Sequence, residues 1–359
     1  MGRPRRISAA ASTRPRIIAS ENLINRIKMT DSILKAGILD TSIATENTGD
    51  LIIMESAREV LDALLSAQAF YFPTHEKLGR TSYRIQKQLS YNIACGTNLL
   101  HAHMGLVKQW NVGLVDAFKL KPVVLMGVGW RSQASRKTDF YTRWLLRRLL
   151  DSQRYHSVRD SYTEGRLREI GFDNVLNTGC PTCWSLTPDH CASIPQSPGD
   201  SAVCVLTDYS RNEEKDAELL DLVCSRYANR YFWCQGSGDM DYIRSLGFDR
   251  YFQFIPPTLR AYHRLLSDSS LALDYVGNRL HGGIYALKHG RRATIIGVDH
   301  RANSMGKDIN LPVIDRYRPF EELESMILDE RATDITLPVS NIEKWSNQFK
   351  EEFQPNGQS

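Results

Sequence analysis

The chain of 359 residues carries 45 Lys and Arg against 41 Asp and Glu, and 42% of its residues are hydrophobic. This composition is typical of soluble globular proteins and excludes a mostly disordered chain, and the net charge of +4 gives no reason to expect a nucleic-acid partner. No segment reaches the ~18 consecutive apolar residues of a membrane span, and the length predicts two domains of roughly 100 to 200 residues each.

Residues 1–30 are rich in arginine and serine, and we expect them to form a flexible basic tail. Five arginines precede the first acidic residue, Glu21. The tail lacks the apolar core of a secretory signal. A transit peptide, a solvated tail and a weak anchor to anionic lipid all fit the pattern. We expect a cytoplasmic protein and leave peripheral contact with the inner face of a membrane open.

Residues 31–186 are predicted to form a first Rossmann-like domain. Short β-rich runs alternate there with helical patterns, as in parallel sheets with crossover helices. The expected helices, 50–67 and 139–153, place apolar residues at i, i+3, i+4 and i+7 with charges on the opposite face. The expected strands cover residues 37–44, 69–72, 91–95, 122–129, 154–159 and 173–177.

Residues 187–200 are rich in Pro, Ser and Asp without periodicity, which predicts a linker. The β/α alternation restarts over 201–335, a second Rossmann-like domain, and 336–359 should supply a C-terminal helix and tail. The fold class is therefore α/β, with two doubly wound domains. Such sheets bind ligands at the carboxyl ends of their strands, so the active site is expected in the cleft between the domains.

Seven cysteines are spread over apolar settings, which favours reduced thiols over a disulfide framework. Cys180, Cys183, His190 and Cys191 form one group with the spacing Cys-x-x-Cys followed by His-Cys. A structural zinc site normally uses a second, well-spaced ligand pair, and a redox motif normally opens the first helix of a βαβ unit. A tight turn at a domain edge is the favoured interpretation.

Several strand ends of the first domain carry groups suited to a ligand site. Asn47, Gly49 and Asp50 follow the first strand and lead into a helix, where glycine allows a ligand to approach and free N–H groups favour an anion. Asp50 alone would more often be only a helix cap. Thr97 and Asn98 follow the strand at 91–95.

Two arginines also follow strands of the first domain directly. Arg131 comes after the run at 122–129, and Arg159 precedes Asp160 at the end of the run at 154–159. A surface arginine is usually a solvated charge, but these positions lie where the cleft is expected.

The second domain concentrates cations at two strand ends. Arg279, His281 and Gly282 open a helix after one strand, and His300 and Arg301 follow the next. A guanidinium fork and helix N–H groups suit a compact, multiply charged anion. A lone histidine is more often structural, but His281 is accompanied by other cationic groups.

These residues resemble the polysaccharide pyruvyl transferase family over about residues 40–315. The motifs that carry the resemblance are NTGD, CGTNLL, MGVG, SVRDSYTEGRLREIGFDNVLNTGCPT and YVGNRLHGGIYALKHGRRATIIGVDHR. Two positions depart from the family pattern: Asn278 stands where many members have Ser, and GCPTCW replaces a common Asp-Pro. Both departures are compatible with a subfamily that uses a different acceptor.

The resemblance implies a GT-B-like fold and transfer of the pyruvyl group of phosphoenolpyruvate to two hydroxyls of a sugar, which forms a cyclic ketal. The family's acceptors are bacterial capsule, exopolysaccharide or cell-wall glycans, and in one fungal branch a galactose cap. By the family pattern, Arg279 and His281 contact phosphoenolpyruvate. No metal or other cofactor is implied.

The reaction handles negative charge or a proton at every step, which assigns expected roles to the remaining residues. Arg279 would clamp the phosphate or the carboxylate, and Arg131, Arg159 or Arg301 would hold the other group, with Gly282 allowing close approach. His281 is the preferred general acid or base and is expected to titrate near neutral pH.

The expected acceptor side is the first domain. Asp50, or less favourably Asp160, would deprotonate the acceptor hydroxyl. The acceptor-binding residues are predicted to be Asn47, Gly49, Asp50, Thr97 and Asn98. The acceptor is expected to be a cell-surface glycan or its lipid-linked precursor.

Two other functions remain open from the sequence. A GT-B glycosyltransferase that uses a nucleotide sugar typically binds the donor ribose through a carboxylate of the C-terminal domain. No Glu lies between residues 219 and 320, although Asp274 and Asp299 are available. A non-catalytic protein that binds an anion or a glycan on the same fold is the second, because a fold does not fix a function.

Overall fold

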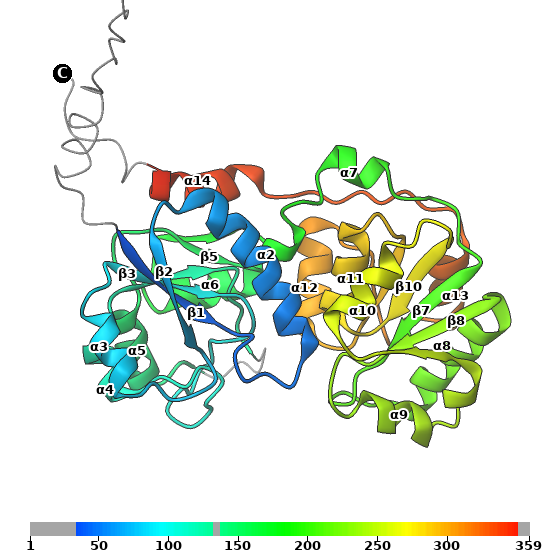
Figure 1. Ribbon diagram of the computed structural model, residues 1–359, viewed down its shortest axis with the longest axis horizontal. Coiled ribbons are helices and arrows are strands. Elements are labelled where there is room, and N and C mark those ends of the chain that lie inside the picture. The colour runs from blue at the N-terminus through cyan, green and yellow to red at the C-terminus, as the bar shows by residue number, and fades with distance from the viewer. Residues whose placement is uncertain (1–33, 132–136, 351–359) are drawn as a thin grey trace, which may run out of the picture.

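The computed structural model describes residues 34–131 and 137–350. Two α/β halves, each built on a parallel sheet, lie next to one another along the long axis of the molecule (Figure 1). The predicted fold class is confirmed. The predicted tail at 1–30 lies outside the described residues.

The N-terminal half contains a four-stranded parallel sheet in the order β2-β1-β3-β4, with a β5-β6 pair beside it. Single parallel bridges join Val123 of β4 to Leu150, which precedes β5, and Val128, which follows β4, to Val158 of β5. Both faces are covered by helices, which explains why β3 and β4 are apolar along most of their length. The strands are β1 (Lys35–Asp40), β2 (Gln68–Pro73), β3 (Tyr91–Cys95), β4 (Val123–Met126), β5 (His156–Val158) and β6 (Val175–Asn177).

Polar side chains cap several helices of this half. The side chain of Asn47 accepts from Gly49 N at the start of α2, and the side chains of Asp139 and Asp160 cap α5 and α6. The helices are α2 (Thr48–Leu64), α3 (Arg80–Gln86), α4 (Leu114–Lys119), α5 (Phe140–Leu149) and α6 (Ser161–Glu169).

The C-terminal half has a six-stranded parallel sheet in the order β12-β11-β10-β7-β8-β9. Counted within this half, the order is 3-2-1-4-5-6, which is the doubly wound Rossmann topology. Its strands are β7 (Ser201–Val205), β8 (Asn229–Trp233), β9 (Gln253–Ile255), β10 (Leu273–Gly277), β11 (Ala293–Gly297) and β12 (Val313–Asp315). Its helices are α8 (Glu213–Arg226), α9 (Asp239–Ser245), η2 (Asp249–Tyr251), α10 (Leu259–Leu266), α11 (Leu280–Lys288), α12 (His300–Ile309) and α13 (Phe320–Leu328).

The segment between the two sheets contains the short helices η1 (Pro181–Cys183) and α7 (Pro188–Ala192). Cys180, Cys183 and Cys191 are buried in the hydrophobic cluster that also holds α11, and His190 Nε2 donates to the Leu287 carbonyl at 2.8 Å. The cysteine-rich group therefore packs the chain against the C-terminal half. No three His, Cys, Asp or Glu side chains of the described residues gather as a metal-binding group.

Side chains of α2 and α11 join the two halves. Tyr285 donates to Glu55 at 3.0 Å, and Lys288 pairs with Glu59 at 2.5 Å. A second contact between the halves joins α6 to α12: the backbone N–H and the hydroxyl of Ser161 both donate to Asp308. The last helix, α14 (Val339–Lys350), returns from the C-terminal half to pack on the N-terminal one (Figure 1).

The part of the chain that the structure describes includes no helix long and apolar enough to cross a membrane.

Replacement of Trp345 by Ala tests whether α14 is an integral part of the N-terminal half. Trp345 is fully buried, donates from Nε1 to the Leu125 carbonyl at 3.0 Å and packs edge-on against Trp184. Loss of a buried Trp side chain costs about 3 to 5 kcal/mol, so Trp345→Ala should lower the free energy of unfolding in urea by that amount. Val339→Ala, on the same helix but 55% exposed, is the control. A loss below about 1 kcal/mol would show that α14 packs only weakly.

Candidate active site

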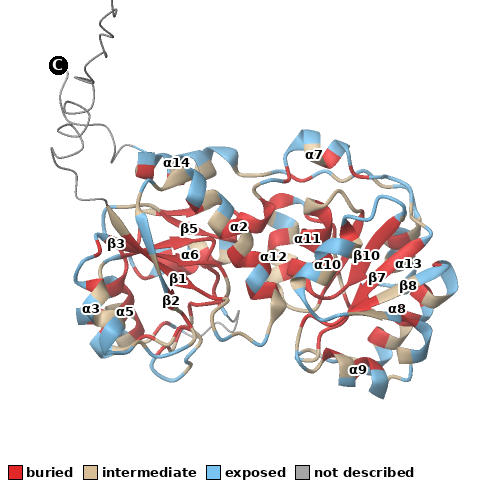
Figure 2. Cartoon of the chain, viewed as in Figure 1, coloured by how far each residue is buried: buried red, intermediate tan, exposed pale blue. Residues whose placement is uncertain are grey.

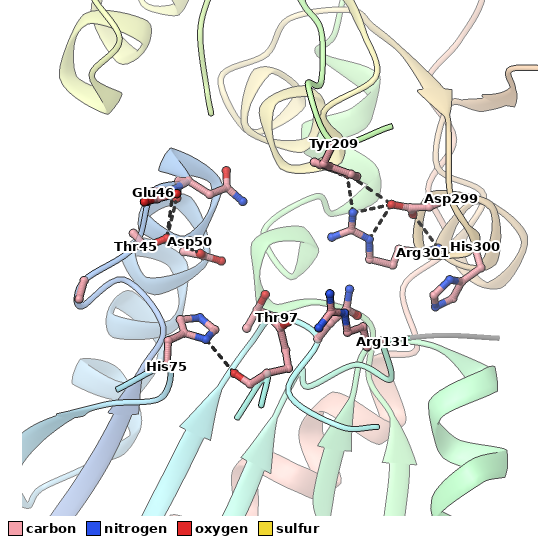
Figure 3. A pocket seen from close by; sticks show the side chains of 14 residues that line it. Thr45, Glu46, Asp50, His75, Thr97, Arg131, Tyr209, Asp299, His300 and Arg301 are labelled. Carbon is pink, nitrogen blue, oxygen red and sulfur yellow. Dashed lines mark hydrogen bonds and ion pairs between the residues drawn. The ribbon is translucent and has the colours of Figure 1, made fainter. Parts of the chain in front are cut away.

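A pocket of about 600 Å³ lies between the two halves, at the carboxyl ends of their strands (Figure 3). Every loop that lines it follows a parallel strand, as expected for doubly wound domains. The N-terminal half contributes Ala44, Thr45, Glu46, Asn47, Asp50, His75, Thr97, Asn98, Gln109 and Arg131, and the C-terminal half contributes Tyr209, Asp299, His300 and Arg301.

Asp50 is the central carboxylate of the N-terminal wall. It is buried, and Thr45 donates to its Oδ2 at 2.6 Å. Burial raises the pKa of Asp50 above the ordinary range, against the opposing effects of Thr45, His75, Thr97 and Arg301. An aspartate with a raised pKa retains a proton more readily and is a stronger base when ionised, so this group suits proton transfer.

Thr97 and Asn98 enter the pocket through an unusual backbone turn after β3. Gly96 and Thr97 have φ angles of +61° and +46°. A β-branched residue in this region is strained, and such strain gathers at functional sites. The turn is held because Gly129 N donates to the Thr97 carbonyl at 2.8 Å.

Arg301 is the main cation of the C-terminal wall. Its Nε donates to Asp299 Oδ2 at 2.8 Å, and its Nη2 donates to the Tyr209 hydroxyl at 2.5 Å. Burial disfavours the Asp299 carboxylate, but Arg301 outweighs that effect and lowers the pKa of Asp299 to about 2. Asp299 also caps α12, so it fixes the guanidinium rather than meeting a ligand as a free base.

Arg131 and Arg159 differ sharply in their surroundings. Arg131 is exposed and forms no ion pair with the residues that the structure describes. Arg159 is buried behind Asn98, to whose Oδ1 it donates, and its Nε lies 3.3 Å from Asp160. Asp160 in turn accepts from Thr163 N and Thr163 Oγ1 at the start of α6, so it acts as a helix cap. Of these two arginines, only Arg131 lines the pocket.

Arg279, which is expected to contact phosphoenolpyruvate, does not line the pocket in this structure. Its side chain is only 4% exposed, and its guanidinium donates to Asp239 and, at 3.0 Å, to Asp208. The same guanidinium lies 5.0 Å from the centre of the Tyr209 ring, and Arg301 lies 5.5 Å from that centre. Arg279 therefore supports the wall from behind, through Tyr209.

His281 is also buried behind the pocket, with Nε2 at 3.9 Å from Cys180 Sγ. Burial, followed by the charges of Arg159 and Arg301, lowers the pKa of His281 to about 3. The expectation that it titrates near neutral pH is wrong, because a cation at this place would be desolvated beside two other cations. His281 is a neutral imidazole at physiological pH.

Gly49 and Gly282 both pack closely against the side chain of Gln235. A Cβ on Gly49 would lie 2.6 Å from Gln235 Nε2, and one on Gly282 would lie 3.1 Å from Gln235 Oε1. Gln235 itself donates to Asn47 Oδ1 at 2.9 Å, and its carbonyl accepts from Thr48 N. Gly49 thus allows close approach between the N-terminal half and Gln235, whereas Gly282 packs against Gln235 within the C-terminal half.

The structure brings six of the eleven predicted site residues to the pocket: Asn47, Asp50, Thr97, Asn98, Arg131 and Arg301. The other five lie outside its lining: Gly49, Arg159, Arg279, His281 and Gly282. Sequence reasoning missed His75, Gln109 and Tyr209. His75 and Tyr209 follow β2 and β7 within a few residues, so the strand-end rule was the signal that pointed to them.

The solved structure of one epimerase supports the fold. The UDP-GlcNAc 2-epimerase of Methanocaldococcus jannaschii, solved with UDP-GlcNAc and UDP, has a TM-score of 0.54 and 10% sequence identity over 89% of this chain and 99% of that one. A putative UDP-N-acetylglucosamine 2-epimerase from Listeria monocytogenes has a TM-score of 0.45 and 10% identity over 89% of this chain and 91% of that one. At this identity the likeness concerns the fold alone. No curated protein sequence matches the chain significantly.

The sequence profile of the polysaccharide pyruvyl transferase family matches residues 47–300. This range begins at the Asn47 cap of α2 and ends at His300, so it includes nearly all the loops that build the pocket. The chain belongs to the polysaccharide pyruvyl transferase family, whose members are transferases that modify glycans.

Proposed function

We propose that the protein transfers the pyruvyl group of phosphoenolpyruvate to two hydroxyls of a sugar in a cell-surface glycan or its lipid-linked precursor, forming a ketal and releasing phosphate. The observation that carries the proposal is one pocket that combines two kinds of group. Asp50, Thr97 and Asn98 offer acid–base and hydrogen-bonding groups, while Arg131 of the N-terminal half and Arg301 of the C-terminal half offer positive charge.

The donor requires two anion-binding groups, one for its phosphate and one for its carboxylate. Arg131 and Arg301 meet this need because both line the pocket and guanidinium groups bind such anions in a bidentate manner. Arg301 is oriented by Asp299 and Tyr209 before any ligand arrives. Arg159 supports the site indirectly, through its contact with Asn98.

The reaction balances without an oxidant or a reductant. A proton adds to the methylene carbon of phosphoenolpyruvate, and one sugar hydroxyl adds to the central carbon and loses its proton. The bond from that carbon to the phosphate oxygen then breaks, and phosphate leaves with its electron pair. The second hydroxyl adds to the same carbon and loses its proton, which completes the ketal.

Asp50 is the group that we assign to proton transfer with the acceptor hydroxyl. Its raised pKa makes the ionised form a better base than an ordinary aspartate. Arg131 and Arg301 would stabilise the negative charge that develops on the departing phosphate.

The contact of Arg279 and His281 with phosphoenolpyruvate, which the family resemblance implies, stays a prediction; in this structure neither side chain lines the pocket. Arg279 Nη2 pairs with Asp239 and Asp208, so a direct contact would need another nitrogen of the guanidinium or a rearrangement of these pairs. We assign Arg279 a positioning role, in which it holds Tyr209 against Arg301. We assign His281, as a neutral imidazole, a packing role behind Arg159 and Arg301.

A nucleotide-sugar donor finds less support in the pocket. Asp274 is buried against Tyr227 and Arg292 and does not reach the pocket. Asp299 does line it but is occupied by Arg301. Neither carboxylate is therefore free to bind a ribose.

Replacement of the two pocket arginines tests donor binding. Hydrogen bonds to charged groups contribute about 1.5 to 3 kcal/mol, so Arg131→Gln and Arg301→Gln should each weaken phosphoenolpyruvate binding at least about tenfold in calorimetric titration. The matched control is Arg250→Gln, at an exposed arginine on η2 outside the pocket. Unchanged phosphoenolpyruvate affinity in both variants, with tighter binding of UDP than of phosphoenolpyruvate, would contradict the proposal.

Asp50→Asn should separate stability from activity. Because the folded pKa of Asp50 is raised, its ionisation costs stability at neutral pH and costs nothing below the unfolded value near 3.8. The variant should therefore have a higher melting temperature than the wild type at pH 7.5, a difference that shrinks as the pH falls toward 4, and it should lose at least about a hundredfold in turnover. Wild-type turnover in Asp50→Asn would remove Asp50 from the mechanism.

A further inference from the structure

Residues 77–150 carry almost all their charge with one sign. They contain 13 Lys and Arg and only two acidic residues, in a chain whose net charge is only +4. Both acids are engaged: Asp116 is buried and accepts from Tyr83 Oη, and Asp139 caps α5 and pairs with His103 at 2.8 Å. The described residues of this segment therefore include no free carboxylate to balance its exposed bases. These bases include Arg80, Arg84, Lys108, Lys119, Arg147 and Arg148.

The same segment exposes large apolar side chains. Leu106 and Phe140 are 85% and 84% exposed, and Leu114, Val115 and Phe118 are each more than half exposed. Exposed apolar residues that occur singly need no explanation, but a contiguous group does. We call the surface formed by these five apolar side chains and the exposed bases of residues 77–150 the α4–α5 face.

Ring contacts show that the α4–α5 face is continuous. Phe118 of α4 packs 6.0 Å from Trp144 of α5, and Trp144 lies 6.2 Å from Tyr141. A Cβ on Gly105 would lie 3.2 Å from the Tyr141 ring, so the loop that carries Leu106 packs on the same helix. The helices α3, α4 and α5 lie together on the side of the N-terminal half away from the C-terminal half (Figure 1), and much of their surface is exposed (Figure 2).

Cations are interleaved with the apolar side chains rather than placed apart from them. The Arg148 guanidinium lies 5.3 Å from the centre of the Phe118 ring. A groove of about 370 Å³ beside α4 is lined by Lys77 and Lys108 together with Leu114 and Val115. Aromatic and aliphatic side chains among lysines and arginines are the signature of a surface that lies in the interface of an anionic bilayer.

We propose that the α4–α5 face docks on an anionic lipid bilayer, with Leu106, Phe118 and Phe140 entering the boundary between headgroups and acyl chains and the bases contacting lipid phosphates. Charge complementarity decides in favour of lipid over a second copy of the chain, because a twofold contact would bring two cationic faces together. The most exposed apolar side chains project from loops and helix ends, so they suit insertion into a soft surface.

The α4–α5 face also borders the pocket. His75 and Gln109 line the pocket, and the neighbouring Lys77 and Lys108 line the groove. His75 Nδ1 donates to the Gln109 carbonyl at 2.9 Å, which holds the two loops together. Docking would place the mouth of the pocket beside the bilayer, where a lipid-linked saccharide would present its sugar; this last step alone rests on the proposed function.

Vesicle flotation of the full chain tests the docking directly. The chain should float with vesicles of phosphatidylcholine and phosphatidylglycerol but not with phosphatidylcholine alone, and high salt should weaken the binding. Lys108→Gln combined with Lys119→Gln should lower the affinity at least about tenfold, because each base near an anionic surface contributes severalfold. Leu106→Ser combined with Phe140→Ser should abolish flotation.

Matched variants outside the face keep the test specific. Tyr317→Ser, at a side chain 74% exposed on the other half, and Arg250→Gln should float as the wild type does. All variants should keep the wild-type melting temperature and phosphoenolpyruvate titration, so failure of the docking is distinct from failure of the proposed reaction. Flotation that survives both face variants but is lost when Arg3, Arg5 and Arg6 are changed to Gln would overturn the proposal. Conversion of a dimer to a monomer by Leu106→Ser and Phe140→Ser, without any vesicle binding, would also overturn it.

Discussion

The buried carboxylate of Asp239 is the group on which the C-terminal side of the cleft depends. Its side chain is fully buried, and burial raises the pKa of Asp239 although the Arg279 guanidinium opposes that rise. Oδ2 accepts from Gln235 N at 3.0 Å and Gly236 N at 2.7 Å, while Oδ1 accepts from Asp208 N and Arg279. One carboxylate thus organises the loops after β7 and β8 and neutralises the arginine between them.

The loops that Asp239 holds in place also shape the pocket. The Gln235 loop reaches Asn47 in the N-terminal half, and the Asp208 loop carries Tyr209, which lies against both Arg279 and Arg301. Removal of Asp239 would leave Arg279 as a buried, poorly compensated charge, which is strongly destabilising. The arginines at the strand ends therefore have two different roles. Arg159 and Arg279 support the walls, and Arg131 and Arg301 line the pocket.

The pKa values of two carboxylates in the pocket are shifted in opposite directions by their surroundings. Burial raises the pKa of Asp50, whereas Arg301 lowers the pKa of Asp299 to about 2 in spite of burial. Divergent environments of this kind separate a group that exchanges protons from one that only holds charge. The proposed roles of Asp50 and of the Asp299–Arg301 pair follow from this difference.

The sequence predicted the architecture well because its signal is local. Apolar runs of strand length, such as 91–95, became buried parallel strands, and the 3.6-residue pattern located α2 and α5. Strand β12 escaped prediction because three residues after a proline carry no periodicity. The linker interpretation likewise missed α7, which has only five residues.

The site was predicted only in part, because its charge balance is not local. Arg279 is separated by 71 residues from Asp208 and by 40 from Asp239, so its ion pairs could not be inferred from sequence spacing. The low pKa of His281 is likewise not a local property, because it depends first on burial in the folded chain and then on the charges of Arg159 and Arg301, which are distant in sequence or lie on another element. The position of a residue after a strand predicts that it lies near the cleft, but it does not tell whether the side chain faces the ligand or supports the wall.

The most direct test of the account is transfer of label from phosphoenolpyruvate to a glycan. The purified chain would be incubated with phosphoenolpyruvate labelled in the pyruvyl carbons and with saccharide or lipid-linked saccharide acceptors, and both the labelled glycan and free phosphate would be measured. The account predicts one phosphate released for each pyruvyl group transferred, as an acid-labile ketal, and loss of both signals in Arg301→Gln. Absence of label from every acceptor, with sugar transferred instead from a nucleotide donor, would contradict it.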